Sequence, residues 1–139
     1  EVITVSHTAV ATVSAIELCG AKPVLVDVEP GFYSLDATKL QAALSSRTRA
    51  ILLVHLYGQA CDLDPVLHFK RRNGLALIED CSQAHGATWR NRRLGVFGDL
   101  SVFSFYPTKN MTSGEGGIIS TSLSSTSASA IWMAGESNE

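Results

Sequence analysis

Polar side chains follow four apolar segments of the chain, at the point where each segment ends. The segments cover residues 1–6, 49–55, 75–79 and 100–105, and their branched aliphatic residues are typical of buried β-strands. In an open α/β sheet, ligands bind beyond the carboxyl ends of the strands. The four loops are therefore predicted to meet at one rim of the sheet, where the candidate side chains are His7, Thr8, His55, Tyr57, Asp80, Gln83, His85, Ser104, Lys109 and Asn110.

Asp80 directly follows the apolar run LALIE. A carboxylate at the end of a buried strand is energetically costly unless it meets a cation. The protonated nitrogen of a pyridine ring is such a cation, and an aspartate paired with it keeps the ring an electron sink. The alternative is that Asp80 caps the turn after the strand.

Lys109 lies just beyond the run SVFSF, after a Pro-Thr turn. A lysine amine withdrawn from water is a good nucleophile towards aldehydes, whereas a single lysine in a loop is more often an exposed charge. The company of Asp80, Gln83 and Ser104 favours the first interpretation. The Ser104 hydroxyl can bind a phosphate oxygen.

Several other kinds of site are not supported by the sequence. No G-x-G-x-x-G follows the first strand and no G-x-S-x-G occurs, so neither a dinucleotide site nor a nucleophile elbow is predicted. His55 and His85 lack ligand partners at a recognised spacing, so no metal site is predicted and both are expected to be hydrogen-bonded residues. The glycines at positions 114, 116 and 117 are expected to serve tight turns.

The composition is that of an ordinary folded domain. The chain has 139 residues, 45% of them hydrophobic, and its net charge of -2 gives no reason to expect nucleic acid as a partner. Arg90, Arg92 and Arg93 are expected to form a solvated face. Three cysteines, an odd number, argue against a disulfide framework and favour reduced thiols in a cytoplasmic protein. No apolar run is long enough to span a bilayer.

Strands and helices are predicted to alternate through most of the chain. Helices are expected over residues 8–18, 37–44 and 64–73, and further strands over residues 22–28 and 118–121. This alternation predicts an α/β fold of three layers, α/β/α, with a mostly parallel sheet. Residues 1–121 are expected to form the core, and the Ser-rich segment 122–139 is expected to be either a tail of low order or a final helix.

Two segments carry a specific likeness to a known family. They are IEDCSQAHGA and FSFYPTKN, in this order and at this spacing, with GAKPVLVDVEP and GEGGIIST in support. The chain from residue 1 to about residue 121 resembles the DegT/DnrJ/StrS family of nucleotide-sugar aminotransferases, which use pyridoxal 5′-phosphate (PLP) and have the fold of type I PLP enzymes. The resemblance implies that the chain is part of a PLP-binding large domain that is truncated at both ends. The family's Gly-Thr phosphate loop is expected upstream of residue 1, and its small domain is expected after the C-terminal end of this segment.

The resemblance also implies a role for each candidate residue. Lys109 matches the lysine that binds PLP covalently and later moves the substrate proton. Asp80 matches the carboxylate at the pyridine nitrogen. Gln83 matches a side chain near the ring hydroxyl, and Ser104 matches a hydroxyl at the cofactor phosphate.

The first loop departs from the family pattern. Family members often carry an aromatic residue directly after the threonine of this loop, where it stacks on the cofactor ring, but this chain has Ala9. Thr8 and His7 are therefore further candidates for contact with the cofactor, with His7 as a substitute for the stacking residue.

The implied reaction transfers an amino group from an amino acid, usually glutamate, to a keto-sugar nucleotide, and the implied enzyme is a homodimer. A related dehydratase branch has a histidine in place of the catalytic lysine, so Lys109 argues against it. Two alternatives stay open. One is a relative that binds PLP or a sugar without turnover, and the other is a non-functional fragment.

Overall fold

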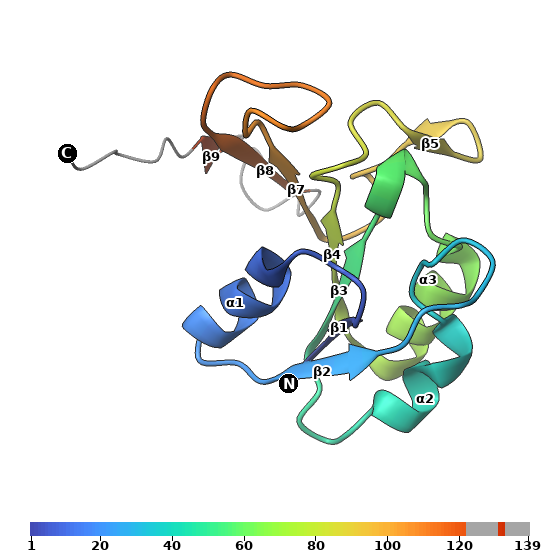
Figure 1. Ribbon diagram of the computed structural model, residues 1–139. Helices are drawn as coiled ribbons and strands as arrows, with labels where there is room; N and C mark the ends of the chain where they lie inside the picture. Colours follow the sequence, from blue (N-terminus) through green and yellow to red (C-terminus); the bar gives the residue numbers. More distant parts are fainter. Residues whose placement is uncertain (122–130, 133–139) are drawn as a thin grey trace.

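The computed structural model describes residues 1–121 and 131–132 and contains a seven-stranded sheet (Figure 1). Its strand order is β2-β1-β3-β4-β7-β8-β9; the first five strands run parallel, and β8 and β9 each run antiparallel to the strand before them. The predicted α/β fold with a mostly parallel sheet is therefore confirmed. The strands are β1 (Val2–Val5), β2 (Pro23–Val26), β3 (Ala50–Val54), β4 (Ala76–Asp80), β7 (Leu100–Ser104), β8 (Gly117–Thr121) and β9 (Ile131–Trp132).

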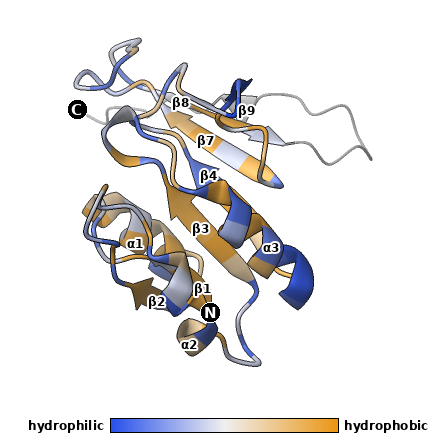
Figure 2. Cartoon of the chain, turned by 90° about the vertical axis from the view of Figure 1, so that its right-hand side faces the viewer, coloured by the Kyte–Doolittle hydropathy of each residue, from blue (hydrophilic) through white to orange (hydrophobic). Residues whose placement is uncertain are grey.

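Helices cover both faces of the sheet. α1 (Val10–Leu18) lies on one face, and α2 (Leu40–Ala43) and α3 (Leu63–Asn73) lie on the other (Figure 1). The central strands are apolar on both faces, as a parallel sheet between helices requires, and β3 is coloured as hydrophobic along its length in Figure 2. Among the helices of the described residues, none is long and apolar enough to cross a membrane.

Helix α3 shows how the local sequence sets the ends of an element. The helix begins one residue before the predicted start, because Asp62 is its N-cap and accepts a hydrogen bond from the backbone N–H of Asp64. At the other end, Gly74 adopts the left-handed conformation (φ 63°) that ends many helices, as the sequence indicated.

The structure changes one predicted helix and leaves most of the predicted tail undescribed. The predicted helix over residues 37–44 is a 3-10 turn, η1 (Ala37–Lys39), followed by the single turn of α2. Asp36 accepts a hydrogen bond from Thr38 N–H and caps η1. The predicted tail, residues 122–139, lies outside the described residues except for β9.

A short hairpin, β5 (Thr88–Trp89) and β6 (Arg92–Arg93), is not predicted from the sequence. Its two turn residues, Arg90 and Asn91, both have positive φ (47° and 60°). Such turns usually carry Asn-Gly, so an arginine at the first position does not predict a hairpin turn. The Arg90 guanidinium lies 4.6 Å from the centre of the Trp89 ring. All three arginines are exposed, so the predicted solvated face is confirmed.

A buried carboxylate joins the middle of the sheet to the loop before β7. The Glu79 side chain is fully buried, and its oxygens accept hydrogen bonds from the backbone N–H groups of Gly95 (3.0 Å), Phe97 (2.7 Å) and Gly98 (2.6 Å). Nε2 of buried His55 lies 3.2 Å from the same carboxylate. Burial by itself raises the pKa of Glu79, but the hydrogen bonds from His55 and the three amides outweigh it, so the pKa lies below its ordinary value.

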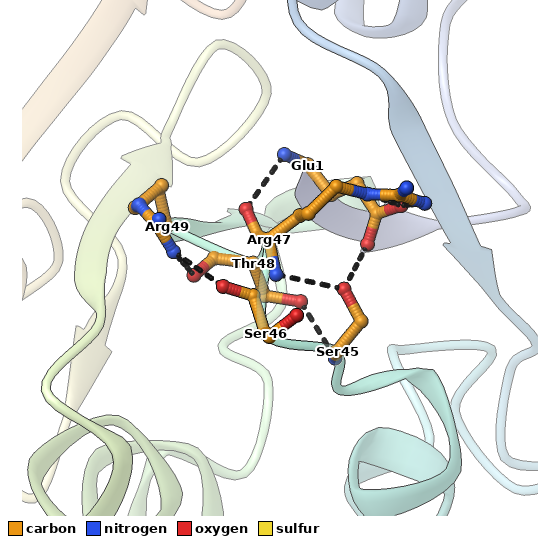
Figure 3. A network of polar contacts seen from close by, with 6 residues as sticks. All are labelled: Glu1, Ser45, Ser46, Arg47, Thr48 and Arg49. Carbon is orange, nitrogen blue, oxygen red and sulfur yellow. Dashed lines mark hydrogen bonds and ion pairs between the residues drawn. The ribbon is translucent and has the colours of Figure 1, made fainter.

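A second polar network holds the start of β1 against the loop before β3 (Figure 3). The Glu1 carboxylate accepts hydrogen bonds from Ser45 and from the Arg47 guanidinium (Nη2 to Oε1, 2.6 Å). The backbone N–H of Arg49 donates to the Glu1 carbonyl (3.0 Å). The hydrogen bonds from Ser45 and Arg47 lower the pKa of Glu1 to about 2. This network fixes β1 beside β3 at the edge opposite the strand ends that carry the candidate residues.

Replacing Glu79 with alanine is expected to lower the free energy of unfolding by about 3 kcal/mol or more, because His55 and three backbone N–H groups lose this acceptor inside the core. Denaturant unfolding followed by circular dichroism measures the change. Glu17→Ala, on the exposed side of α1, is the matched control and is expected to change the free energy by less than about 0.5 kcal/mol. A Glu79→Ala protein as stable as this control would contradict the role of the buried carboxylate.

The lowered pKa of Glu79 predicts acid sensitivity. Because the folded-state pKa lies below the unfolded value of 4.5, the stabilisation is fully present above that value and is lost as the pH falls through the folded-state pKa. Glu79→Gln cannot titrate, so the stability difference between the native protein and this variant should narrow as the pH falls below 4.5. Unfolding titrations over this range measure the narrowing, and a constant difference would speak against it.

Candidate functional site

Five of the predicted site residues line a single cavity between α1 and the sheet. Its volume is about 520 Å³, and it lies on the face of the sheet that α1 covers. We call it the α1 cavity. The walls are mostly apolar, with side chains such as Leu52, Ile78 and Val102 from the central strands. The predicted residues that line it are Thr8, Asp80, Gln83, Ser104 and Lys109. They come from the segment before α1, from the end of β4 and the loop after it, and from the end of β7 and the loop after it.

Asp80 caps a turn with one oxygen and borders the α1 cavity. Its Oδ1 accepts a hydrogen bond from Ser82 N–H (2.9 Å), so the capping interpretation is correct for that oxygen. Its Oδ2 lies 3.5 Å from the hydroxyl of Thr12, a long hydrogen bond. The Thr12 hydroxyl is in turn 2.9 Å from the hydroxyl of Thr8. Within residues 1–121 and 131–132, no cationic side chain forms an ion pair with Asp80. The carboxylate therefore faces an apolar cavity without a counter-ion.

Lys109 borders the α1 cavity and also a second, smaller cavity of about 250 Å³. We call the second one the Tyr57 cavity; its lining is Tyr57, Gln83, Thr108, Lys109 and Asn110. The loop that carries the lysine is fixed by local hydrogen bonds, since Lys109 N–H donates to the Tyr106 carbonyl (2.9 Å). The amine is thus supplied from an ordered loop where an apolar and a polar cavity meet.

Gln83 connects the two cavities. Its side-chain Oε1 accepts a hydrogen bond from the backbone N–H of Tyr57 (3.1 Å), which leaves the Gln83 amide group as the available donor. Ser104 lines the α1 cavity at the end of β7, and its hydroxyl accepts a hydrogen bond from Tyr106 N–H (3.3 Å). Gly114 and Gly116 serve a turn as predicted, with φ of 89° and 131°. Gly117 does not, because it is the first residue of β8 and pairs with Ser104.

The structure does not bring His7 into the lining of either cavity. The Nε2 of His7 lies 2.7 Å from the Tyr57 hydroxyl, and its ring centre lies 5.9 Å from that of Tyr57 and 6.4 Å from that of Tyr33. Ala9 and Thr8, in contrast, do line the α1 cavity. In this arrangement His7 contacts Tyr57 and holds it in place. This contact differs from the predicted stacking of His7 on the cofactor ring.

The other two candidate histidines, His55 and His85, divide into one correct and one wrong prediction. His55 is hydrogen-bonded as predicted, because its Nδ1 accepts from Cys61 N–H (3.2 Å) and its Nε2 meets Glu79. His85 is not: both ring nitrogens are buried and have no hydrogen-bond partner among the described residues. Its ring packs between Phe103 and Phe105, each with ring centres 5.6 Å away, so hydrophobic packing decides its position.

Buried metal-ligand residue types do gather at one place, but their bonding is that of a packed core. Atoms of His55, Glu79 and Cys81 lie within 4.8 Å of one another. Both ring nitrogens of His55 and both oxygens of Glu79 already have partners, and burial raises the pKa of the Cys81 thiol. The cysteines at positions 19, 61 and 81 are all free, as expected.

Sequence reasoning missed two residues that shape the site, Glu79 and Thr12, and named a third, Tyr57, without its conformation. Glu79 lies within an apolar run, so its role is not apparent from the sequence. The only available signal was that an acidic residue in this strand could meet His55, the histidine at the end of the neighbouring strand. Thr12, which approaches Asp80, lies one helical turn after Thr8. Tyr57 was named only as a rim residue, and nothing in its type shows that it adopts a left-handed conformation.

Comparisons with known proteins agree with the geometry. The profile of the DegT/DnrJ/EryC1/StrS aminotransferase family matches residues 1–134. GDP-perosamine synthase of Caulobacter vibrioides is 50% identical over 121 residues, which are 87% of this chain and 33% of that protein. L-glutamine:scyllo-inosose aminotransferase of Streptomyces griseus is 49% identical over 121 residues, 87% of this chain and 28% of that protein.

The fold is shared as well. The crystal structure of DesV from S. venezuelae, in complex with a ketimine intermediate, matches 86% of this chain and 33% of its own with a TM-score of 0.82 and 43% identity. The chain therefore spans about a third of the length of the relatives it matches. The cofactor of these aminotransferases is PLP. By its sequence profile, its fold and the residues gathered at the α1 cavity, the chain belongs to the DegT/DnrJ/EryC1/StrS aminotransferase family.

Proposed function

We propose that this chain provides the PLP-binding part of an enzyme that transfers an amino group from an amino acid to a keto-sugar nucleotide. One observation carries the proposal: a carboxylate without a counter-ion, Asp80, and an amine, Lys109, border the same mostly apolar cavity. A pyridine ring that carries a proton on its nitrogen and an aldehyde on its edge complements both groups. The buried partners of Asp80 and the ordered loop of Lys109 pre-organise the pair.

The residues fit PLP by the chemistry of their donor set. Asp80 would hold the proton on the pyridine nitrogen, and the Ser104 hydroxyl would bind a phosphate oxygen. The Gln83 amide would donate to the ring hydroxyl, since its oxygen is already engaged by Tyr57. Thr8 would contact the cofactor from the first loop. PLP, when bound, supplies an electron sink for charge that develops on the substrate carbon.

Lys109 would act twice in the reaction. Its amine would hold the cofactor covalently as a nucleophile, and once released it would move a proton at the substrate carbon. Asp80 would support this second task, because a carboxylate that keeps the pyridine nitrogen protonated keeps the cofactor an electron sink. Both tasks need the amine to lie at the cavity, and the presence of Lys109 in the cavity lining supports this.

The names of the relatives support the proposed class of substrates. Names of the matched proteins point to an activated sugar, perosamine on GDP, in one case and to a cyclitol ketone, scyllo-inosose, in another. The acceptor proposed for this chain is accordingly a ketone on a six-membered polyhydroxylated ring, carried by a nucleotide. The proposed donor is glutamate, with L-glutamine as the second amino acid to test because a relative's name contains it. The proposed assembly of the whole protein is a homodimer.

Adding PLP to the chain is expected to produce a visible absorption band, and borohydride should fix the cofactor on Lys109. Peptide mapping identifies the labelled residue among the four lysines of the chain. Lys109→Arg is expected to lose the band, whereas the exposed Lys22→Arg control should keep it. A label found mainly on another lysine would defeat the assignment.

Asp80→Asn tests the carboxylate without removing the turn cap, because asparagine keeps an oxygen for Ser82 N–H. The affinity for PLP and the rate at which L-glutamate bleaches the band are each expected to fall at least about tenfold, the effect of losing a charged hydrogen bond. Asp64→Asn, a change of the same size at an exposed position, is the control. If neither L-glutamate nor L-glutamine bleaches the absorption band of the native chain with PLP bound, the chain binds the cofactor without turnover.

A further inference from the structure

Tyr57 has a backbone conformation that an aromatic residue seldom adopts. It lies in the 3-10 turn η2 (Leu56–Gly58) with φ 57° and ψ 23°, in the left-handed region, and Gly58 after it has φ 74°. Glycine tolerates this region, whereas a side chain with a Cβ is strained there. Such strain persists only where the surroundings enforce it, and it gathers at functional sites.

Both ends of Tyr57 are held by other loops of the site. Its backbone N–H donates to Gln83 Oε1 (3.1 Å), and its hydroxyl lies 2.7 Å from His7 Nε2. The residue is nevertheless 59% exposed, so it is not part of the hydrophobic core. Packing therefore does not explain why a strained tyrosine stands here. The contacts instead present the ring to solvent in a fixed position beside Lys109.

The Tyr57 cavity has the chemistry of a carbohydrate site. Thr108 offers a hydroxyl and Asn110 an amide, which together can donate to and accept from the hydroxyl groups of a ligand. The tyrosine ring offers a flat apolar face of the kind that covers the C–H side of a sugar ring. Lys109 and Gln83 are shared with the α1 cavity, so a ligand here lies directly beside the reacting amine.

We propose that the Tyr57 cavity binds the polyhydroxylated ring of the amino-group acceptor, with Tyr57 as the residue that determines its specificity. The proposal rests on the proposed function and names the subsite that this function requires. The Tyr57 ring stacks on the acceptor ring, Thr108 and Asn110 bind its hydroxyls, and His7 and Gln83 hold the tyrosine in place. The nucleotide part of the acceptor is not read by this cavity.

The test is a binding titration followed by amide NMR signals of Thr108 and Asn110. The protein is the whole 139-residue chain with PLP fixed on Lys109 by borohydride, so that no turnover occurs. The probes are scyllo-inosose, GDP-perosamine and GDP alone. The first two are expected to shift the same signals and GDP alone is expected not to. Signals that move only with GDP, or with none of the three, would overturn the proposal.

Variants at two strained tyrosines separate recognition from folding. Tyr57→Gly removes the ring and the strain together, so it should be at least as stable to heat as the native chain and should bind scyllo-inosose about tenfold more weakly. Tyr33→Gly is the matched control, because Tyr33 also has positive φ (60°), is also exposed and lines neither cavity. Tyr57→Phe keeps the ring and should bind within about threefold of the native chain.

The outcomes are distinguishable. Native-like binding by Tyr57→Gly, or a loss in Tyr57→Phe as large as in Tyr57→Gly, would refute ring stacking. If the PLP label maps to a residue other than Lys109, the proposed function fails on its own. In that case the same titration on the chain without PLP, with the same NMR signals and the same variants, tests whether the Tyr57 cavity binds the ring of the acceptor.

Discussion

The carboxylate of Glu79 is the interaction on which the arrangement of the site depends. It is fully buried and accepts hydrogen bonds from His55 at the end of β3 and from the amides that precede β7. These partners would be costly to bury without an acceptor, and the charge would be costly to bury without donors. The strands β3, β4 and β7 therefore have one relative position in which all of these groups are satisfied, and their ends carry the candidate residues.

Alternation along β4 transmits this constraint to the cavity. Successive side chains of a strand point to opposite faces, so Glu79 faces the core and Asp80 faces the α1 cavity. Fixing the first carboxylate fixes the register and direction of the second. The two acids also have opposite surroundings, since Glu79 is saturated with donors whereas Asp80 has one firm and one long hydrogen bond. The saturated acid serves the fold, and the under-satisfied acid is the one suited to bind a cation.

The sequence predicts those features that local chemistry determines. The apolar runs define the parallel strands, Gly74 ends α3, and five of the ten polar candidates named after the strands do gather on one cavity. Features that depend on distant contacts are not predictable in this way. The burial of Glu79 needs a loop sixteen residues later, from Gly95 onwards, and the contact of His7 with Tyr57 spans fifty residues. The turn at Arg90 lacks the glycine that would have marked it.

In the proposed function, the two cavities would let a single amine serve both halves of an amino transfer. An apolar cavity that contains a carboxylate without a counter-ion suits an aromatic cofactor, and a polar cavity suits a hydroxylated acceptor. Lys109 borders both cavities, so its amine would move a proton at a carbon that lies between them without any rearrangement of the sheet. Gln83 also lines both cavities and accepts a hydrogen bond from the Tyr57 backbone. The position of Tyr57 in the Tyr57 cavity is therefore coupled to the loop that follows Asp80. A change at Gln83 must therefore act on both cavities at once, in contrast to changes at Ser104 or Asn110, each of which lines one of them.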